Sequence, residues 1–229
     1  SPDGRYLLLT IYGSGEDGQR SYDQLHIYDV VNQRQWLLVE DAFAYGAASW
    51  SPDSRRVVYT RASEFGVGVF TIGLAGADER LITVTDIYPW YPVWSPDGGR
   101  IAFTDYFDNL YVVSAQGGEA RVLGASLGGL PCGRRFLAWS GDGEGLIYCR
   151  QDTLYRLSAD EAVEHVLASG LNSAPGVLTT HDAIAMTGDH SIPPTVDILS
   201  LSGGESSAYS LPEADRLLNP RWSSDGRFL

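Results

Sequence analysis

Short apolar runs alternate along this chain with tight polar turns. The clearest case is an aromatic residue, Trp94, followed by the turn at 95–99 and the apolar run at 100–104. Pro96 presets φ for the second position of a type I turn, and an Asp-Gly pair suits the positions that follow it. A tight turn between two apolar runs predicts a β-hairpin.

The same phrase recurs along the chain. Its serine stands at positions 1, 51, 95, 140 and 223. The last interval spans about two units, and a shortened, proline-free copy at 180–187 falls inside it. A period of roughly 40 to 50 residues, with several short strands per unit, is the sequence signature of a β-propeller.

We therefore expect an all-β fold, a β-propeller of four-stranded antiparallel blades, with about five blade units visible. In the third unit, the strands after the first would cover 100–104, 110–114 and 120–123. The segment 160–168 also fits a helix with Asp160 as its N-cap, but the repeat register favours a strand. The expected organisation is one propeller domain over residues 1–229, with units near 1–50, 51–94, 95–139, 140–179 and 180–222 and the start of another at 223–229.

Most units carry a tryptophan before the turn and an aspartate within it. A tryptophan is too large to be hidden by one hairpin, so we expect it to pack on a neighbouring sheet. The aspartate is expected to accept backbone N–H groups of its own turn. Calcium coordination is the alternative, and it would need several oxygens converging on one point. The repeat residues are Trp50, Asp53, Trp94, Asp97, Trp139, Asp142, Trp222 and Asp225.

Four antiparallel strands, A to D, place the A–B and C–D turns at one end of each blade and the B–C and D–A loops at the other. Loops held by a rigid scaffold are where binding sites usually lie. Aromatic residues gather in the second group, and such residues dominate protein interfaces. A partner-binding surface is expected there, and the alternative is that the rings seal the blade ends. The candidates are Phe43, Tyr45, Tyr88, Trp90, Tyr91, Tyr106, Phe107 and Asp108.

Composition narrows the classes of partner. The chain has 16 basic and 29 acidic residues, a net charge of −13. This balance speaks against a sequence-independent nucleic-acid binder and against an anionic membrane surface. No apolar run is long enough for a transmembrane helix. Cys132 and Cys149 form no CxxC motif, which excludes a zinc knuckle. Two buried thiols are expected, with a disulfide as the alternative, so the compartment stays open.

Three further patterns carry little chemistry. Residues 124–128 match the G-x-S-x-G nucleophile elbow, but Gly129, Leu130 and Pro131 will not start the helix that this elbow requires. Residues 13–18 match G-x-G-x-x-G, but the next element reads as a strand, which cannot hold a pyrophosphate. The four histidines show no metal-ligand spacing. We expect no catalytic, cofactor-binding or metal-binding residues in this chain.

The W-S-P-D-G-x-x-I-A-F type of repeat, followed by L-Y-V-V and G-G-E at 110–119, resembles the WD-like repeat of TolB-type propellers. The resemblance covers essentially the whole chain and is specific for the fold, but weak for function. The chain departs from the pattern at Gly141, which replaces proline, and in the fifth unit, where the turn is lost. The resemblance implies a ring of six to eight blades, of which this chain would be an excerpt. It also implies a periplasmic or other extracytoplasmic setting, while a cytoplasmic one stays open.

Similar repeats build TolB, a protein-interaction module, and the N-terminal propellers of prolyl oligopeptidase-type peptidases. Residues 186–194 loosely resemble a His-Pro-Pro loop of the second group, with Ser191 and Ile192 standing between His190 and the prolines. We expect a non-catalytic scaffold that binds a protein or peptide through loops on one face or over the central channel. The alternative is the substrate-gating propeller of such a serine peptidase, whose hydrolase domain would lie outside this chain.

Overall fold

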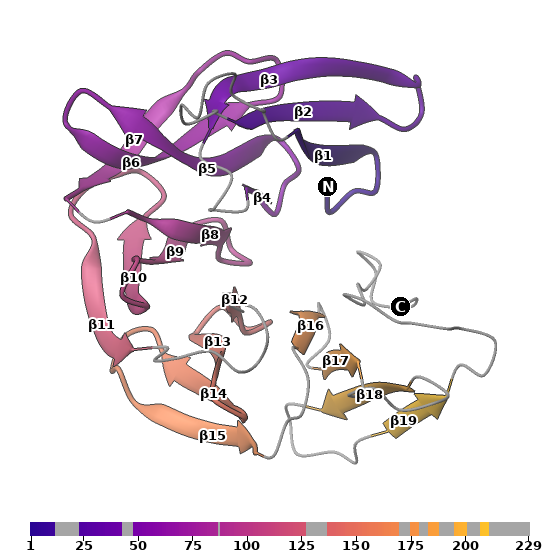
Figure 1. The fold of residues 1–229 in the computed structure, drawn as a ribbon, viewed down its shortest axis with the longest axis vertical. Helices are drawn as coiled ribbons and strands as arrows, with labels where there is room; N and C mark the ends of the chain where they lie inside the picture. Colours follow the sequence, from indigo (N-terminus) through magenta and orange to yellow (C-terminus); the bar gives the residue numbers. More distant parts are fainter. Residues whose placement is uncertain are drawn as a thin grey trace, which may run out of the picture. The chain divides into compact units, whose positions relative to one another are not determined.

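The fold comes from a computed structural model, which describes residues 1–11, 23–42, 48–86, 88–126, 137–169, 175–178, 183–187, 195–200 and 207–210. The described ranges contain β-strands and no helices, and the strands form five separate antiparallel sheets (Figure 1). No helix in this part of the chain could span a membrane.

Each sheet is built from consecutive strands. The three-stranded sheet contains β1 (Tyr6–Ile11), β2 (Asp23–Asp29) and β3 (Arg34–Ala42). The second contains β4 (Ser49–Trp50), β5 (Arg56–Ser63), β6 (Gly66–Gly73) and β7 (Arg80–Thr85). The third contains β8 (Trp90–Trp94), β9 (Arg100–Thr104), β10 (Asn109–Ser114) and β11 (Arg121–Ser126). The fourth contains β12 (Leu137–Trp139), β13 (Gly145–Arg150), β14 (Thr153–Ser158) and β15 (Glu164–Ala168). The fifth contains β16 (Pro175–Leu178), β17 (Ala183–Thr187), β18 (Thr195–Ser200) and β19 (Ser207–Ser210).

These sheets confirm the predicted all-β fold of four-stranded antiparallel blades. Strand order follows chain order in every sheet, so each sheet is a simple meander. The helix considered for 160–168 is wrong, because β15 pairs with β14 over this segment. The shortened repeat copy forms β17, which pairs with β16 on one side and β18 on the other.

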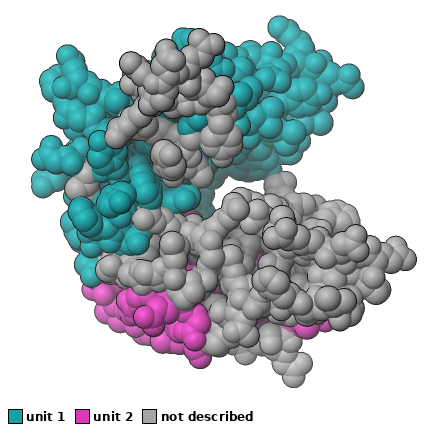
Figure 2. Space-filling view, viewed as in Figure 1, with its two compact units in different colours: residues 1–124 teal, residues 125–229 magenta. Residues whose placement is uncertain are grey.

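The chain divides into two compact units, Ser1–Gly124 and Ala125–Leu229 (Figure 2). The first unit contains the sheets from β1 to β10 and the beginning of β11, and the second contains β12 to β19. The expectation of one domain over residues 1–229 stays a prediction.

The repeated turn is held by its serine and aspartate. In the third sheet, the Ser95 hydroxyl donates to Asp97 Oδ1 at 2.5 Å and accepts from the Arg100 backbone N–H at 2.9 Å. Asp97 Oδ1 also accepts from the Gly99 N–H at 2.9 Å. The Gly98 N–H closes the β-turn on the Ser95 carbonyl at 2.9 Å, and φ at Gly98 is +72°. Glycine adopts this left-handed conformation without steric cost.

Hydrogen bonds of the same kind hold the turns around Asp53 and Asp142, with Ser51 and Ser140 as the donors. In each of these turns the Oδ1 atom of the aspartate accepts hydrogen bonds from its own turn, while Asp142 Oδ2 accepts from Arg156 at 2.6 Å. The described residues contain no group of three or more potential metal ligands. Trp222 and Asp225 lie outside the described residues.

The core of the first unit lies between neighbouring sheets. Val58, Val69 and Ile82 of the second sheet pack with Ile101 and Phe103 of the third, and the partly buried repeat residue Trp94 packs against this cluster. Another cluster joins the first two sheets, and Trp50 packs against it. Burial of each such side chain stabilises the fold by about 2 kcal/mol. The buried side chains come from two sheets, so each blade needs its neighbour to cover its apolar face.

A polar brace recurs in the second and fourth sheets and was not predicted from the sequence. In the second sheet, the Tyr59 hydroxyl and the Arg61 guanidinium, two residues apart on β5, both donate to Glu79, the residue that precedes β7. Arg61 also lies over the Phe70 ring of β6, 4.8 Å from its centroid. The brace therefore ties three strands of one blade together.

The fourth sheet repeats the brace with Tyr148 and Arg150 of β13 donating to Glu164 of β15. Arg150 lies 4.2 Å from the centroid of the Tyr155 ring on β14. Burial opposes ionisation of Glu164, but these two hydrogen bonds outweigh it and leave the pKa of Glu164 below its ordinary value.

The cysteine expectation is wrong. Cys149, on β13, is buried as expected, but it is disulfide-bonded rather than a free thiol. The only other cysteine in the sequence is Cys132, which lies outside the described residues. The sequence pattern favoured thiols because the two cysteines stand at unequal distances from the intervening turn. Disulfides persist mainly in oxidising compartments.

Asp29 makes the stability of the first sheet dependent on pH. Its carboxylate accepts hydrogen bonds from the Val31 and Asn32 N–H groups, the Asn32 amide and Arg5. The Asn32 N–H is the main cause that lowers the pKa of Asp29 to about 2, from an ordinary value of 3.8. The folded state therefore favours the ionised form, and its contribution is complete above pH 4 and lost as the pH falls towards 2.

We expect wild-type protein to lose stability between about pH 4 and pH 2, and Asp29→Asn to lose less over this interval. The measurement is denaturant unfolding at several pH values. Glu40→Gln, which removes an exposed carboxylate on β3 that has no described hydrogen bond, is the matched control and should keep the wild-type slope. A wild-type slope in Asp29→Asn would contradict the prediction.

Candidate functional site

The predicted aromatic candidates belong to two neighbouring connections of the third sheet. Tyr88 precedes β8, and Trp90 and Tyr91 begin this strand. Tyr106, Phe107 and Asp108 lie in the connection from β9 to β10. Phe43 and Tyr45 lie outside the described residues.

Four of these rings form a continuous series of edge-to-face contacts. The Trp90 ring lies 6.5 Å from Tyr91 and 5.5 Å from Tyr106, and the Tyr106 ring lies 5.6 Å from Phe107. The interplanar angles are between 79° and 90°. Such T-shaped pairs are favourable beyond the area that they bury. We call Tyr88, Trp90, Tyr91, Tyr106 and Phe107 together the aromatic surface.

The aromatic surface is half anchored and half exposed. Trp90 and Tyr91 are partly buried, whereas Tyr88 is 45%, Tyr106 58% and Phe107 69% exposed. Trp90 and Tyr91 are thus shielded in part. Tyr106 contacts Trp90, Phe107 contacts Tyr106, and both of these outer rings are exposed to solvent. A single exposed apolar residue is ordinary, but a packed group of exposed aromatic rings is typical of an interaction site.

The first connection gains its shape from a β-bulge in β8. Trp90 pairs with Thr104, while the next paired residue, Val93, faces Ala102. The intervening Tyr91 has φ of +53°, in the left-handed region that bulky residues rarely occupy. A conformation of this kind costs of order 1–3 kcal/mol and tends to persist at functional sites.

The second connection is held by a residue that sequence reasoning missed. Asp105 is 1% exposed, and its carboxylate accepts hydrogen bonds from the Asn109 N–H at 2.9 Å and the Asn109 amide at 2.8 Å. It also accepts from the Tyr111 hydroxyl at 3.0 Å. Burial and this hydrogen bond raise the pKa of Tyr111, which keeps its hydroxyl protonated as a donor.

Backbone bonds complete the same loop. The Asp105 N–H donates to the Asn109 carbonyl at 3.1 Å, and the Asp108 N–H donates to the Asp105 carbonyl at 3.1 Å. Asp108 has φ of +65°, which aspartate tolerates better than most residues. Asp105 therefore fixes the loop that presents Tyr106 and Phe107. The sequence signal for it was an Asp-x-x-x-Asn spacing at the end of an apolar strand, which resembles an Asx-type turn.

A second exposed aromatic residue was also missed. Phe65 is 69% exposed in the tight connection from β5 to β6. This connection is the B–C loop of its blade, as 105–108 is in the next one. The alternation of strand direction therefore places Phe65 at the same end of its sheet as Tyr106 in the third sheet. Phe65 is the single aromatic residue of its two-residue loop, Glu64–Phe65, so the sequence shows no aromatic cluster there.

Comparison with known proteins gives the fold. No family model matches the chain. Its structure resembles a TolB-type protein from Agrobacterium tumefaciens, with a TM-score of 0.68 and 20% identity over 99% of this chain and 84% of that one. It also resembles TolB from Acinetobacter baumannii, with a TM-score of 0.60 and 15% identity over 88% of this chain. The chain spans 50% of the length of that second protein.

The fold is a TolB-like β-propeller. Two other solved structures that resemble this chain have different descriptions. One comes from a nidogen/laminin complex, with a TM-score of 0.63 and 16% identity over 90% of this chain and 76% of that one. The other is an oligogalacturonate lyase in complex with manganese, with a TM-score of 0.61 and 12% identity over 99% of this chain and 82% of that one. At these identities the likeness describes the fold and not the activity.

The predicted peptidase loop lies mainly outside the described residues, which include only Met186 and Thr187 of 186–194. The gating propeller of a peptidase therefore stays a prediction. Of the two residue patterns that match enzyme motifs, 13–18 lies outside the described ranges, whereas the first three residues of 124–128 belong to β11.

Proposed function

We propose that this propeller is a non-catalytic binding module that holds a protein or peptide on the aromatic surface of its third blade. The single observation that carries the proposal is that Tyr106 and Phe107 are largely exposed and yet fixed, through Trp90 and Asp105. A fixed aromatic surface loses little conformational entropy when a partner binds, and such pre-organisation improves affinity.

The charge of the chain favours a basic partner. The net charge is −13, which attracts cationic chains over long distances and speeds their association. Exposed aromatic faces can also hold lysine or arginine side chains by cation–π contacts worth about 1 kcal/mol. We therefore propose a peptide segment in which basic residues flank an apolar anchor.

The comparisons support a binding role without identifying the partner. The similar propeller from the nidogen/laminin complex takes part in a complex between two proteins, as its description states. The lyase is an enzyme with manganese, but the described residues here contain no cluster that could hold a metal. A binding role is consequently the function that the described geometry supports best.

Replacing Phe107 by alanine should weaken peptide binding about tenfold or more and leave thermal stability nearly unchanged, because its ring is mostly in solvent. The peptides would come from a random library selected on the wild-type chain, with affinities measured by calorimetry. Val31→Ala is the matched control, since Val31 is 73% exposed in the β2–β3 turn. This is a C–D turn of the first sheet, whereas Phe107 lies in a B–C loop, at the other end of its blade.

Two outcomes would contradict the proposal. One is a library selection that yields no peptide with a saturable affinity. The other is a set of peptides that bind Phe107→Ala and Tyr106→Ala as tightly as the wild type, which would place their site elsewhere. In that case the aromatic rings would only seal the blade end.

A further inference from the structure

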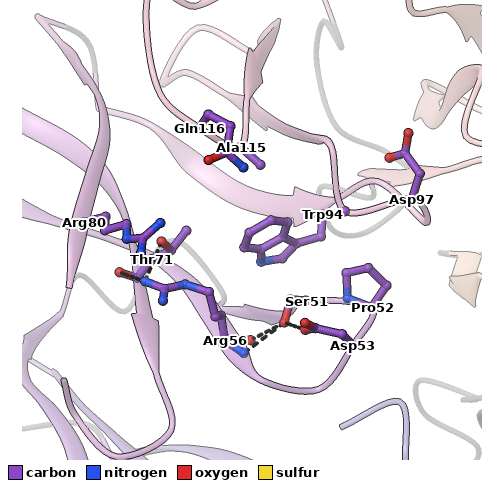
Figure 3. A pocket seen from close by; sticks show the side chains of 11 residues that line it. Ser51, Pro52, Asp53, Arg56, Thr71, Arg80, Trp94, Asp97, Ala115 and Gln116 are labelled. Atoms are coloured by element: carbon purple, nitrogen blue, oxygen red, sulfur yellow. Dashed lines mark hydrogen bonds between the residues drawn. The ribbon is translucent and has the colours of Figure 1, made fainter. Parts of the chain in front are cut away.

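A pocket of about 270 Å³ lies between the turns of the second and third sheets (Figure 3). It is at the end of these blades that carries the Ser-Pro-Asp turns, and thus opposite to the aromatic surface. Two arginines, Arg56 and Arg80, line it together with the repeat residue Trp94. The whole pocket belongs to the first compact unit.

The two arginines form a basic wall beside Thr71. Arg56 Nη2 donates to the Thr71 carbonyl at 3.2 Å, the Thr71 hydroxyl at 3.1 Å and the Asp78 carbonyl at 2.5 Å. Arg80 pairs with Thr71 across β6 and β7, so its side chain begins at the same place. In Figure 3 both guanidinium groups lie near Thr71, on the same side of the pocket.

Among the described residues, no carboxylate forms an ion pair with this basic wall. Arg56 donates its described hydrogen bonds to two carbonyls and a hydroxyl, none of which carries a formal charge. Burial and, second, the positive charge of Arg80 lower the pKa of Arg56. The charges of Asp78 and Asp53 oppose this lowering but do not outweigh it, so the positive charge of the wall is only partly compensated.

Trp94, which also lines the pocket, carries a hydrogen-bond donor that is not used by any described residue. The indole Nε1 of Trp94 is buried and has no hydrogen-bond partner among the residues that the structure describes. Its nitrogen edge is turned towards the Ser51 turn in Figure 3. By contrast, Trp36 on β3 donates its Nε1–H to the Leu74 carbonyl at 2.8 Å. A buried donor without an acceptor destabilises the folded state, and an acceptor brought by a ligand would remove this cost.

Two aspartates line the other side of the pocket, but their inner oxygens are already used. Asp53 Oδ1 accepts from Ser51 and the Arg55 N–H, and Asp97 Oδ1 accepts from Ser95 and the Gly99 N–H. Asp97 points away from the arginines in Figure 3. Their charges disfavour a dianion such as phosphate more than a monoanion.

We infer that this pocket is a carboxylate-binding site, in which Arg80 and Arg56 hold the anionic group of a small organic acid or of a peptide C-terminus. Guanidinium groups match carboxylates in geometry and can bind them through two parallel hydrogen bonds. The pocket volume suits a small group rather than a folded partner. The site is separate from the aromatic surface and does not depend on the function proposed for it.

The test follows the Trp94 indole N–H by NMR on the whole 229-residue chain, with the resonance assigned as the one missing in Trp94→Phe. Sodium acetate, a tripeptide with a free C-terminus and the same tripeptide amidated would each be titrated at constant ionic strength. We expect a saturable shift with acetate, the free tripeptide or both. Saturation by acetate indicates a small organic acid as the natural source, and saturation by the tripeptide alone indicates a chain terminus.

Arg80→Gln should weaken this binding about tenfold, as loss of a charge-assisted contact does. It should leave the fold intact, because Arg80 is exposed and holds no described hydrogen bond through its side chain. Arg55→Gln is the matched control, since Arg55 is exposed in the turn between β4 and β5 but does not line the pocket, and should bind within about twofold of the wild type.

Three results would overturn the inference. The first is a shift that does not saturate, or that sodium chloride reproduces. The second is equal binding of the free and the amidated tripeptide without any response to acetate. The third is tighter binding of inorganic phosphate than of any carboxylate.

Discussion

Replacing Asp105 by alanine should lower the free energy of unfolding by about 3 kcal/mol and greatly weaken peptide binding at the aromatic surface. The carboxylate is buried and accepts two hydrogen bonds from Asn109 and one from Tyr111. Alanine would leave these donors without an acceptor and release the loop that presents Tyr106 and Phe107. Denaturant unfolding and calorimetry with a selected peptide measure the two effects.

Two further variants separate the effects of this substitution. Asp105→Asn keeps the size and one acceptor oxygen, so it should lose about half as much stability. Tyr111→Phe removes only one of the three donors, so its loss should be about 1 kcal/mol. If Asp105→Ala is as stable as the wild type, the loop is not held by this carboxylate and the pre-organised surface loses its physical basis.

Reduction of the disulfide at Cys149 should lower the free energy of unfolding by about 3 kcal/mol, because the bond closes a loop of roughly 17 residues in the unfolded chain. Cys149 also packs in the buried cluster with Ile147, Leu154 and Ile184, so the loss would appear in the second unit. The measurement is denaturant unfolding with and without dithiothreitol.

A variant with alanine at both cysteines is the control, and its stability should not respond to dithiothreitol. Alkylation supplies an independent test of the bond. If iodoacetamide modifies both cysteines of the native protein before any reductant is added, the disulfide is contradicted. Both cysteines would then be free and accessible thiols.

The blades could be predicted from the sequence because the interactions that form each hairpin join residues close together in the chain. Where the repeated turn is present, it fixes the A–B hairpin through hydrogen bonds within six residues, as Ser95, Asp97 and Arg100 illustrate. The apolar runs on either side then need only to pair in order. Even the fifth sheet, whose turn is degenerate, could be found from the repeat period and the apolar run at Ala183–Thr187.

The parts that escaped prediction depend on contacts across strands. Glu79 is distant in sequence from Tyr59, and nothing near either residue indicates that they meet across the blade. Trp94 could be assigned to packing, but the pocket that its unsatisfied nitrogen shares with Arg80 depends on how two blades face each other. The disulfide likewise depends on geometry that spacing alone does not provide.

The aromatic surface falls between these cases. Loop composition and strand alternation brought Trp90, Tyr91, Tyr106 and Phe107 to one end of the blade, and the structure joins their rings in one series. Their exposure could not be predicted, because it depends on the bulge at Tyr91 and on the Asp105 loop. The same residue types could have been buried over the strand ends.

The most direct test of the binding role is hydrogen–deuterium exchange on the whole chain, with and without a peptide selected from the library. The account predicts that the peptide protects the segments 88–91 and 105–109, and that Phe107→Ala removes this protection at the same peptide concentration. Protection confined to the Ser-Pro-Asp turns, or no protection in either aromatic segment despite saturation, would contradict the claim that this surface binds the partner.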